Sequence, residues 1–373
     1  MIFKFRIEKL YLYAGCLLFI VLMFFNASNI SYADANKSIN SVRGFMATPV
    51  KTDIVLTWEK NEGVSGYAIY ESVDLGKTFK EVKTVKGVKK IFTKRERGKT
   101  YTYKVRTYIN QKNKKKYGKY CKPISVTVAT GKSKATLKSL IQTSIAPVGS
   151  TMYIWGGGWN RQDTAAGKDA KRIGLNSNWR VFAEKQNKNY NYQNTKYQWG
   201  NGLDCSGYVG WTVYNILNTG NNKKGYVTFA DKQAKMLSDR GFGKLVKKKN
   251  VKDYQTGDIM SSATHIYIVI GECSDGSVLL VHTSPKGTQI DGTVTPEGKS
   301  NSIAAKLAKK YMKKYYKWWY SKHSIGVKPI SYLTDYEQMR WYIGEDEVMS
   351  DPDGYRDMTA EKILKNLYVS KLF

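Results

Sequence analysis

The stretch Leu203-Asp204-Cys205-Ser206-Gly207 is followed by the apolar run Tyr208-Val209-Gly210-Trp211-Thr212-Val213-Tyr214. Asp204 is a good N-cap residue, and the apolar run is typical of a helix, so the pattern predicts a helix that begins at Cys205. The N-terminus of a helix favours the thiolate, which is the reactive form of cysteine, so Cys205 is a candidate nucleophile. The alternative is a buried, inert cysteine at a helix start.

Two of the three histidines in the chain follow in a predicted β-hairpin. His265 opens one apolar run and His282 lies near the end of the next, with the turn signal Ser274-Asp275-Gly276-Ser277 between them. The start of one antiparallel strand faces the end of its neighbour, so we expect the two imidazoles to lie side by side. A helix-start cysteine packed on this hairpin would complete a Cys-His-His triad.

The chemistry assigns a role to each member of the predicted triad. Cys205 attacks a carbonyl, His265 is the base and later protonates the leaving amine, and His282 fixes the tautomer of His265. The backbone N–H of Cys205 is the expected oxyanion donor, with the hydroxyl of Tyr153 as a second one. The rival use of these residues is a metal site, but their spacing fits no zinc pattern, so we expect neither metal nor cofactor. The remaining histidine, His323, is expected to be an ordinary surface residue.

The composition favours a polyanionic setting, the alternative being that the charge serves only solubility. Its 373 residues suffice for two or three domains, and 61 Lys and Arg against 30 Asp and Glu give a net charge of +31. Residues 1–33 combine Lys4, Arg6 and Lys9 with an apolar run and small residues at the end, which predicts a secretory signal, the alternative being an uncleaved membrane anchor. Export argues against nucleic acid as the partner and favours an anionic cell wall.

Two further features of the sequence are its odd number of cysteines and a β-rich segment. The chain beyond residue 33 has Cys121, Cys205 and Cys273, and this odd number leaves at least one thiol free. Residues 39–130 alternate with period two in several short runs, which predicts an all-β sandwich. This segment resembles a fibronectin type III module in its runs Leu56-Thr57-Trp58, Gly66-Tyr67-Ala68-Ile69-Tyr70 and residues 101–108. Such a module would act as a spacer or a wall-binding unit.

Residues 136–300 resemble an NlpC-type cell-wall cysteine peptidase. The pieces that carry this resemblance occur in the family's order: Tyr153-Ile154-Trp155-Gly156-Gly157, Asp204-Cys205-Ser206-Gly207, Gly257-Asp258-Ile259, residues 265–271 and Val281-His282-Thr283-Ser284. The resemblance implies an α+β papain-like fold with an antiparallel sheet. It also implies hydrolysis of amide bonds in peptidoglycan stem peptides, of the D-Glu–diamino acid type. It assigns catalysis to Cys205, His265 and His282, and substrate binding to Tyr153, Asp204 and Ser206.

The chain departs from the family pattern in three places. Thr264 precedes His265 where the family usually has glycine, residues 160–202 form a longer connection than usual, and residues 301–373 extend beyond the family's core as a predicted helical extension. We therefore expect a multidomain, secreted, wall-associated peptidase whose partners are peptidoglycan and anionic wall polymers. Two alternatives are an N-acetylmuramoyl-L-alanine amidase of papain-like type and a non-catalytic wall-binding protein.

Overall fold

The computed structural model describes residues 39–112, 114–160, 172–218 and 224–369. The chain divides into two compact units, residues 1–40 and 41–373, and the expected signal segment 1–33 lies outside the described residues. Among the helices that are described, none has the length and apolar character needed to cross a membrane.

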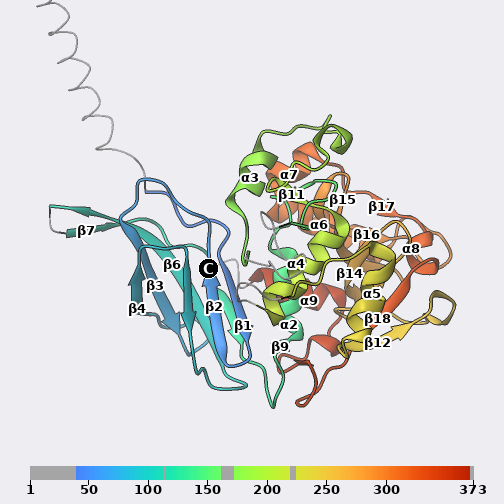
Figure 1. Cartoon of the computed structure of the whole chain (residues 1–373), viewed down its shortest axis with the longest axis horizontal. Coiled ribbons are helices and arrows are strands. Elements are labelled where there is room, and N and C mark those ends of the chain that lie inside the picture. The colour runs from blue at the N-terminus through green and yellow to red at the C-terminus, as the bar shows by residue number, and fades with distance from the viewer. Residues whose placement is uncertain (1–38, 113, 161–171, 219–223, 370–373) are drawn as a thin grey trace, which may run out of the picture. The chain divides into compact units, whose positions relative to one another are not determined.

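Residues 46–127 form an all-β region that the period-two pattern anticipated (Figure 1). Among the described residues its strands form two antiparallel sheets, one in the order β1-β2-β5 and the other in the order β4-β3-β6-β7, with β8 also paired to β6. The strands are β1 (Met46–Val50), β2 (Asp53–Thr57), β3 (Gly66–Ser72), β4 (Lys80–Val85), β5 (Lys89–Phe92), β6 (Thr100–Gln111), β7 (Lys114–Tyr117) and β8 (Ile124–Thr127).

The two sheets share one apolar core. Alternate residues of β6, Tyr101, Tyr103 and Val105, are buried there together with Ile54 and Leu56 from β2. Because successive side chains of a strand point to opposite faces, this alternation buries one face of β6 against the other sheet. The region is therefore a β-sandwich.

The rest of the chain is built on one long sheet, which runs in the order β12-β18-β13-β14-β15-β16-β17 among the described residues. Neighbours are antiparallel except β16 and β17, which are parallel. The strands are β12 (Gly243–Val246), β13 (Ile259–Ser261), β14 (Ile266–Glu272), β15 (Val278–Ser284), β16 (Gly287–Thr293), β17 (Val327–Lys328) and β18 (Glu337–Trp341). Two short parallel pairs add β9 (Ala135–Thr136) to β19 (Met349–Ser350) and β10 (Met152–Tyr153) to β11 (Gly202–Leu203).

Helices pack on this sheet through a large apolar core. The described helices are α2 (Leu137–Ile145), α3 (Ser177–Glu184), α4 (Cys205–Leu217), α5 (Ala230–Asp239), α6 (Ile303–Tyr315), α7 (Lys317–Lys322), α8 (Ser331–Thr334) and α9 (Ala360–Val369). Helix α4 is buried along its whole length and contacts β14 and β15, while α6 lies against β15 and β16. A helix that is apolar all round belongs in a core, and this position brings the first turn of α4 to the predicted hairpin.

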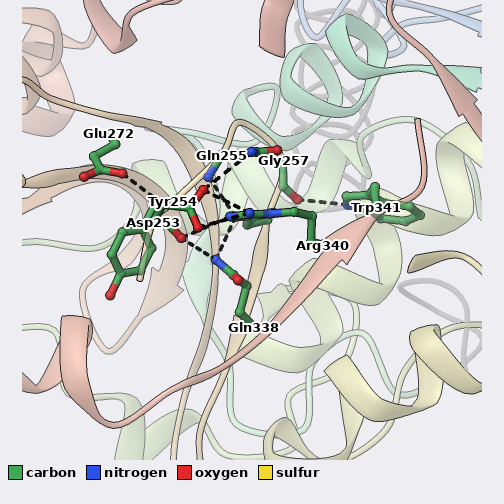
Figure 2. A network of polar contacts seen from close by, with 9 residues as sticks. Asp253, Tyr254, Gln255, Gly257, Glu272, Gln338, Arg340 and Trp341 are labelled. Atoms are coloured by element: carbon green, nitrogen blue, oxygen red, sulfur yellow. Dashed lines mark hydrogen bonds and ion pairs between the residues drawn. The ribbon is translucent and has the colours of Figure 1, made fainter. Parts of the chain in front are cut away.

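The segment 301–373 is more than the expected helical extension, because it supplies β17 and β18 to the sheet. A polar network holds β18 in place (Figure 2). The guanidinium of Arg340 binds Asp253 at 3.0 Å and Asp258 at 2.8 Å, and the amide of Gln338 donates to Asp258 at 2.9 Å. Burial raises the pKa of Asp258 to about 6, and Arg340 beside it opposes this rise. Short strands of this kind give a weak local signal, so the sequence pattern missed them.

Candidate active site

The first turn of α4 holds Cys205 in a tightly packed corner. Asp204 caps the helix, and its carboxylate accepts from the backbone N–H of Gly207 at 2.6 Å and from the hydroxyl of Ser206 at 2.9 Å. A Cβ atom at Gly207 would lie 2.0 Å from the carbonyl oxygen of Gly157, so only glycine allows this approach of the loop. The other carboxylate oxygen accepts from the N–H of Gly156 at 3.1 Å, which ties the loop to the helix start.

The structure brings the two hairpin histidines together, as the spacing predicted. Strands β14 and β15 pair Ile268 with Val281, which puts His265 and His282 on the same face of the sheet. Their rings are 4.9 Å apart between centroids, and Nε2 of His265 lies 2.7 Å from Nδ1 of His282. His282 is fully buried, whereas His265 is partly exposed.

A third group, Asp291 on β16, continues the line beyond the histidines. Its Oδ2 lies 2.9 Å from Nε2 of His282, and both side chains are fully buried. Strand β16 pairs Gln289 with His282, so Asp291 is the diagonal neighbour on the same face. Sequence reasoning missed Asp291, although the alternation of β16 beside His282 was a usable signal. His265, His282 and Asp291 are called the imidazole chain below.

Charge fixes the direction of the hydrogen bonds along the imidazole chain. Asp291 also accepts from Lys328 at 2.8 Å and from the amide of Gln289 at 3.0 Å. Although burial opposes it, the hydrogen bond from His282 and the charge of Lys328 hold the pKa of Asp291 at about 2. The ionised carboxylate accepts from Nε2–H of His282, so Nδ1 of His282 must accept from Nε2–H of His265. Nδ1 of His265 is then a free lone pair, which is what a general base needs.

The thiol of Cys205 differs from the sequence-based expectation of a thiolate. Burial raises the pKa of Cys205 to about 12, and the neighbouring Asp204 carboxylate adds to the rise. The N–H groups of Ser206 and Ile266 act in the opposite direction but do not outweigh it. Burial also holds the pKa of His265 well below its ordinary value of 6.5. At neutral pH the site therefore contains a neutral thiol and a neutral imidazole, because desolvation exceeds the effect of the helix N-terminus.

The thiol of Cys205 lies near the start of β14, and within the described residues no hydrogen bond joins it to the imidazole of His265. The backbone N–H of Ile266, the residue after His265, is one of the groups that act on the sulfur of Cys205. The pKa values of Tyr153 and Tyr336 are raised, first by burial and then in part by Cys205, so both phenols lie near the sulfur. The geometry leaves Nδ1 of His265 as the ring nitrogen available to the thiol, since Nε2 binds His282.

The predicted substrate-binding residues are placed close to the thiol, but two of them are engaged within the protein. Asp204 and Ser206 bind each other, and Ser206 also accepts from the indole of Trp159 at 3.3 Å. Both are buried and support the start of α4. Tyr153 lies on β10, and its ring makes an edge contact with Tyr192 at 5.2 Å.

Tyr332 is a second neighbour that the sequence did not single out. Its ring lies 5.8 Å from that of His265 and 6.2 Å from that of His282, and it stacks on Tyr267 at 5.5 Å. Tyr332 belongs to α8 and precedes β18, so the segment beyond residue 300 covers the imidazole chain with aromatic rings. This cover contributes to the burial of the histidines.

An exposed aromatic surface flanks the loop that caps α4. Trp155 stacks on Tyr192 at 6.4 Å, and Trp159 lies 5.2 Å from Phe229. The most exposed members are Trp155 at 45%, Trp199 at 50%, Tyr197 at 59% and Phe229 at 61%. Large aromatic side chains that remain exposed in a cluster mark an interaction surface. Much of this surface comes from the long connection 160–202, of which residues 161–171 lie outside the described part.

The other cysteines and the third histidine are not members of this arrangement. Cys121 and Cys273 are buried free thiols whose pKa values are raised by burial to about 12 and about 11. His323 was expected at the surface, but it is 5% exposed because it packs on Trp319, with 4.3 Å between the ring centroids. In the described part of the chain, no group of three His, Cys, Asp or Glu side chains is arranged to hold a metal ion.

Comparison with known proteins finds fibronectin type III-like domains among the structural neighbours. No protein-family model matches the chain, and no curated protein does. Among solved structures, a Fn3-like protein from Clostridium thermocellum is 17% identical, covers 25% of this chain and 95% of its own, with a TM-score of 0.22. The sixth fibronectin type III domain of a human protein is 12% identical, covers 26% of this chain and 92% of its own, with a TM-score of 0.22. The chain thus has fibronectin type III-like structural neighbours over about a quarter of its length, and a fold does not fix a function.

Proposed function

We propose that this chain is a secreted cysteine peptidase that hydrolyses amide bonds in peptidoglycan stem peptides, between D-Glu and a diamino acid. The observation that carries the proposal is the imidazole chain, together with a helix-start thiol that lies near the backbone N–H of Ile266, the residue after His265. The buried carboxylate of Asp291 orients His282, and His282 orients His265. This leaves one ring nitrogen with a free lone pair, Nδ1 of His265. That arrangement suits a base beside a nucleophile, and a purely structural core has little use for it.

The neutral resting state gives the first step a definite form. As the sulfur of Cys205 attacks the carbonyl carbon, its proton passes to Nδ1 of His265, and the carbonyl oxygen takes the negative charge. The imidazolium forms only during the attack, and the charge of Asp291 stabilises it through His282. The backbone N–H of Cys205 and the hydroxyl of Tyr153 are our candidates for the oxyanion donors.

The second half of the reaction uses the same groups in reverse. His265 gives the proton to the leaving amine as the C–N bond breaks, which leaves an acyl group on Cys205. Water then attacks this thioester while His265 takes one of its protons, and the released thiol recovers that proton. The products are one amine and one carboxylic acid, and no cofactor is needed.

The surroundings support a polymeric, anionic substrate outside the cell. The segment 1–33 has the layout of an export signal, and the chain carries a net charge of +31. In this proposal the domain around Cys205 is papain-like, and the sandwich is a fibronectin type III-like spacer. The exposed aromatic surface beside α4 would stack on the sugar rings that carry the stem peptides, since aromatic faces pack well on sugar C–H groups.

The burial of Cys205 favours one rival from another class, a non-catalytic wall-binding protein. A thiol whose pKa is raised to about 12 would be inert unless a base removes its proton. Digestion of purified peptidoglycan by the protein and by Cys205→Ala separates the two. Fragments released by the intact thiol alone support the hydrolase, and their masses name the bond. Stem peptides with a free N-terminal alanine would indicate an amidase, and no fragments from either protein would favour the binding protein.

A further inference from the structure

A pocket of about 490 Å³ whose lining includes neither Cys205 nor the imidazole chain is lined by cations. Its walls include Lys188, Lys286 and Lys322, together with Tyr190, Tyr320 and His323. Lys286 lies in the turn between β15 and β16, and Lys322 ends α7, so elements far apart in the sequence converge on it. Neither the catalytic mechanism nor the aromatic surface uses these lysines.

The charges in this pocket are uncompensated within the described part of the chain. No carboxylate lines the pocket, and none of the three lysines forms an ion pair there. The ammonium of Lys286 donates to the hydroxyl of Ser324, which holds it at the pocket wall. Ammonium groups gathered without a counter-charge repel one another, so bringing them together costs free energy. A bound anion removes that cost.

His323 gives the pocket a buried polar group without a partner. The side chain is almost fully buried against Trp319, and its Nε2 has no hydrogen-bond partner among the described residues. Buried polar atoms are nearly always satisfied, so an unsatisfied one indicates a missing ligand, ion or water. Burial and the charges of Lys286 and Lys322 hold the pKa of His323 at about 4, so the imidazole is neutral at pH 7. A neutral imidazole can donate one hydrogen bond to an oxyanion without adding charge.

We propose that this pocket binds a phosphate group. Three ammonium groups can serve several oxygens at once, and a phosphate offers up to four oxygens with one or two negative charges. A carboxylate offers two oxygens and one charge, which would leave part of the pocket unpaired. The phosphate comes from one of two sources: free inorganic phosphate, or the phosphodiester of a glycerol phosphate polymer.

The pocket is joined to the neighbourhood of the thiol by Tyr190. The hydroxyl of this residue donates to the backbone oxygen of Tyr153 at 2.5 Å, and Tyr153 lies near Cys205. Lys286 follows His282 by four residues along the same hairpin. A phosphate polymer held in the pocket would therefore anchor the protein close to its site of action. The phosphate site itself does not depend on the proposed hydrolysis.

Nuclear magnetic resonance of the three histidines tests the proposal directly. Inorganic phosphate is titrated into the protein in a buffer free of phosphate, and the imidazole C–H signal of His323 is followed. We expect this signal to shift saturably while those of His265 and His282 stay in place. In Lys286→Gln and in Lys322→Gln the affinity should fall roughly tenfold, the size of one lost charge-assisted hydrogen bond.

Lys309→Gln is the matched control, since Lys309 is an exposed lysine on α6 outside the pocket, and its affinity should be unchanged. A second titration with short poly(glycerol phosphate) separates the sources. Tighter binding of the oligomer, in competition with phosphate, identifies the polymer, whereas equal or weaker binding identifies free phosphate. The proposal is overturned if millimolar phosphate leaves the His323 signal unmoved, or if all three lysine variants weaken binding equally, which would indicate general attraction to a basic protein.

Discussion

Asp291→Asn tests whether a carboxylate sets the protons of the imidazole chain. The asparagine amide has one oxygen and one NH₂ group. If the NH₂ of the asparagine faces His282, it donates to Nε2 of His282, and the proton of His282 moves to Nδ1. Nδ1 of His282 then donates to Nε2 of His265, so the proton of His265 moves to its Nδ1, the atom that should accept the proton of the thiol. If the oxygen of the asparagine faces His282, its NH₂ faces the NH₂ of Gln289, so two donors oppose each other. Gln289 does not relieve this by flipping, because its amide oxygen accepts from the indole of Trp319 at 3.3 Å. Either arrangement weakens the base.

The pKa of Asp291 gives the size of the effect on stability. Its fall from an ordinary value of 3.8 to about 2 corresponds to about 2 kcal/mol of favourable interaction in the folded state. Because the folded-state pKa is lowered, this contribution is fully present above about pH 4, is roughly half lost near pH 3 and vanishes below about pH 2. Urea denaturation should therefore show wild type about 2 kcal/mol more stable than Asp291→Asn at pH 7, with a smaller gap at pH 3.

The rate of hydrolysis and the tautomer of His265 are the two readouts that a merely structural role of Asp291 would leave unchanged. We expect hydrolysis of peptidoglycan to fall by about 100-fold or more, which is the usual contribution of a general base. Nitrogen chemical shifts of the imidazoles should show Nδ1 of His265 unprotonated in wild type and altered in the variant. Asp231→Asn, an exposed change on α5, is the control and should behave as wild type. Unchanged activity together with an unchanged His265 tautomer in Asp291→Asn would refute the reasoning.

Three further predictions follow from charges and surfaces in the same domain. Asp204→Asn removes a negative charge beside Cys205, so the pKa of the thiol should fall, seen as faster alkylation by iodoacetamide at a given pH; an unchanged or slower rate would contradict the assignment. Arg340→Gln leaves Asp258 buried without its cation and should lower the free energy of unfolding, measured with urea, by about 3 kcal/mol. Adding Asp258→Asn should restore much of this stability, and full additivity of the two changes would show that the two residues do not interact. Trp155→Ala should raise KM for a glycan-linked substrate several-fold without changing kcat, and it should leave the hydrolysis of a soluble stem peptide unchanged. An equal loss of activity on both substrates would exclude sugar stacking.

Local sequence signals predicted the parts of the site that lie within one element. Asp204 before an apolar run predicted the start of α4, and the turn signal at residues 274–277 predicted the hairpin that unites His265 and His282. These signals are strong because capping and turn formation depend on a few neighbouring residues. The same is true of the period-two strands in the sandwich.

What the sequence did not reveal depends on burial and on long-range pairing. The thiolate expected for Cys205 followed from the helix N-terminus alone, whereas its actual environment is set by side chains from several elements. Tyr332 and β18 reach the site and the sheet from segments far along the chain, which periodicity does not encode, whereas Asp291 is missed although the alternation of β16 beside His282 is a local signal. His323 was assigned to the surface because nothing local shows that Trp319 covers it.

The place of β18 in the sheet has a consequence for the order in which the chain is completed. This strand comes near the end of the sequence, yet it lies between β12 and β13, and α8 with Tyr332 arrives just before it. A chain still being made carries Cys205, His265 and His282 before β18 exists, and its sheet is then split into two parts with open edges. Full assembly of the sheet must therefore wait for β18. Hydrogen exchange on a chain that stops before Glu337 should find β12 unprotected and β13 protected only where it pairs with β14.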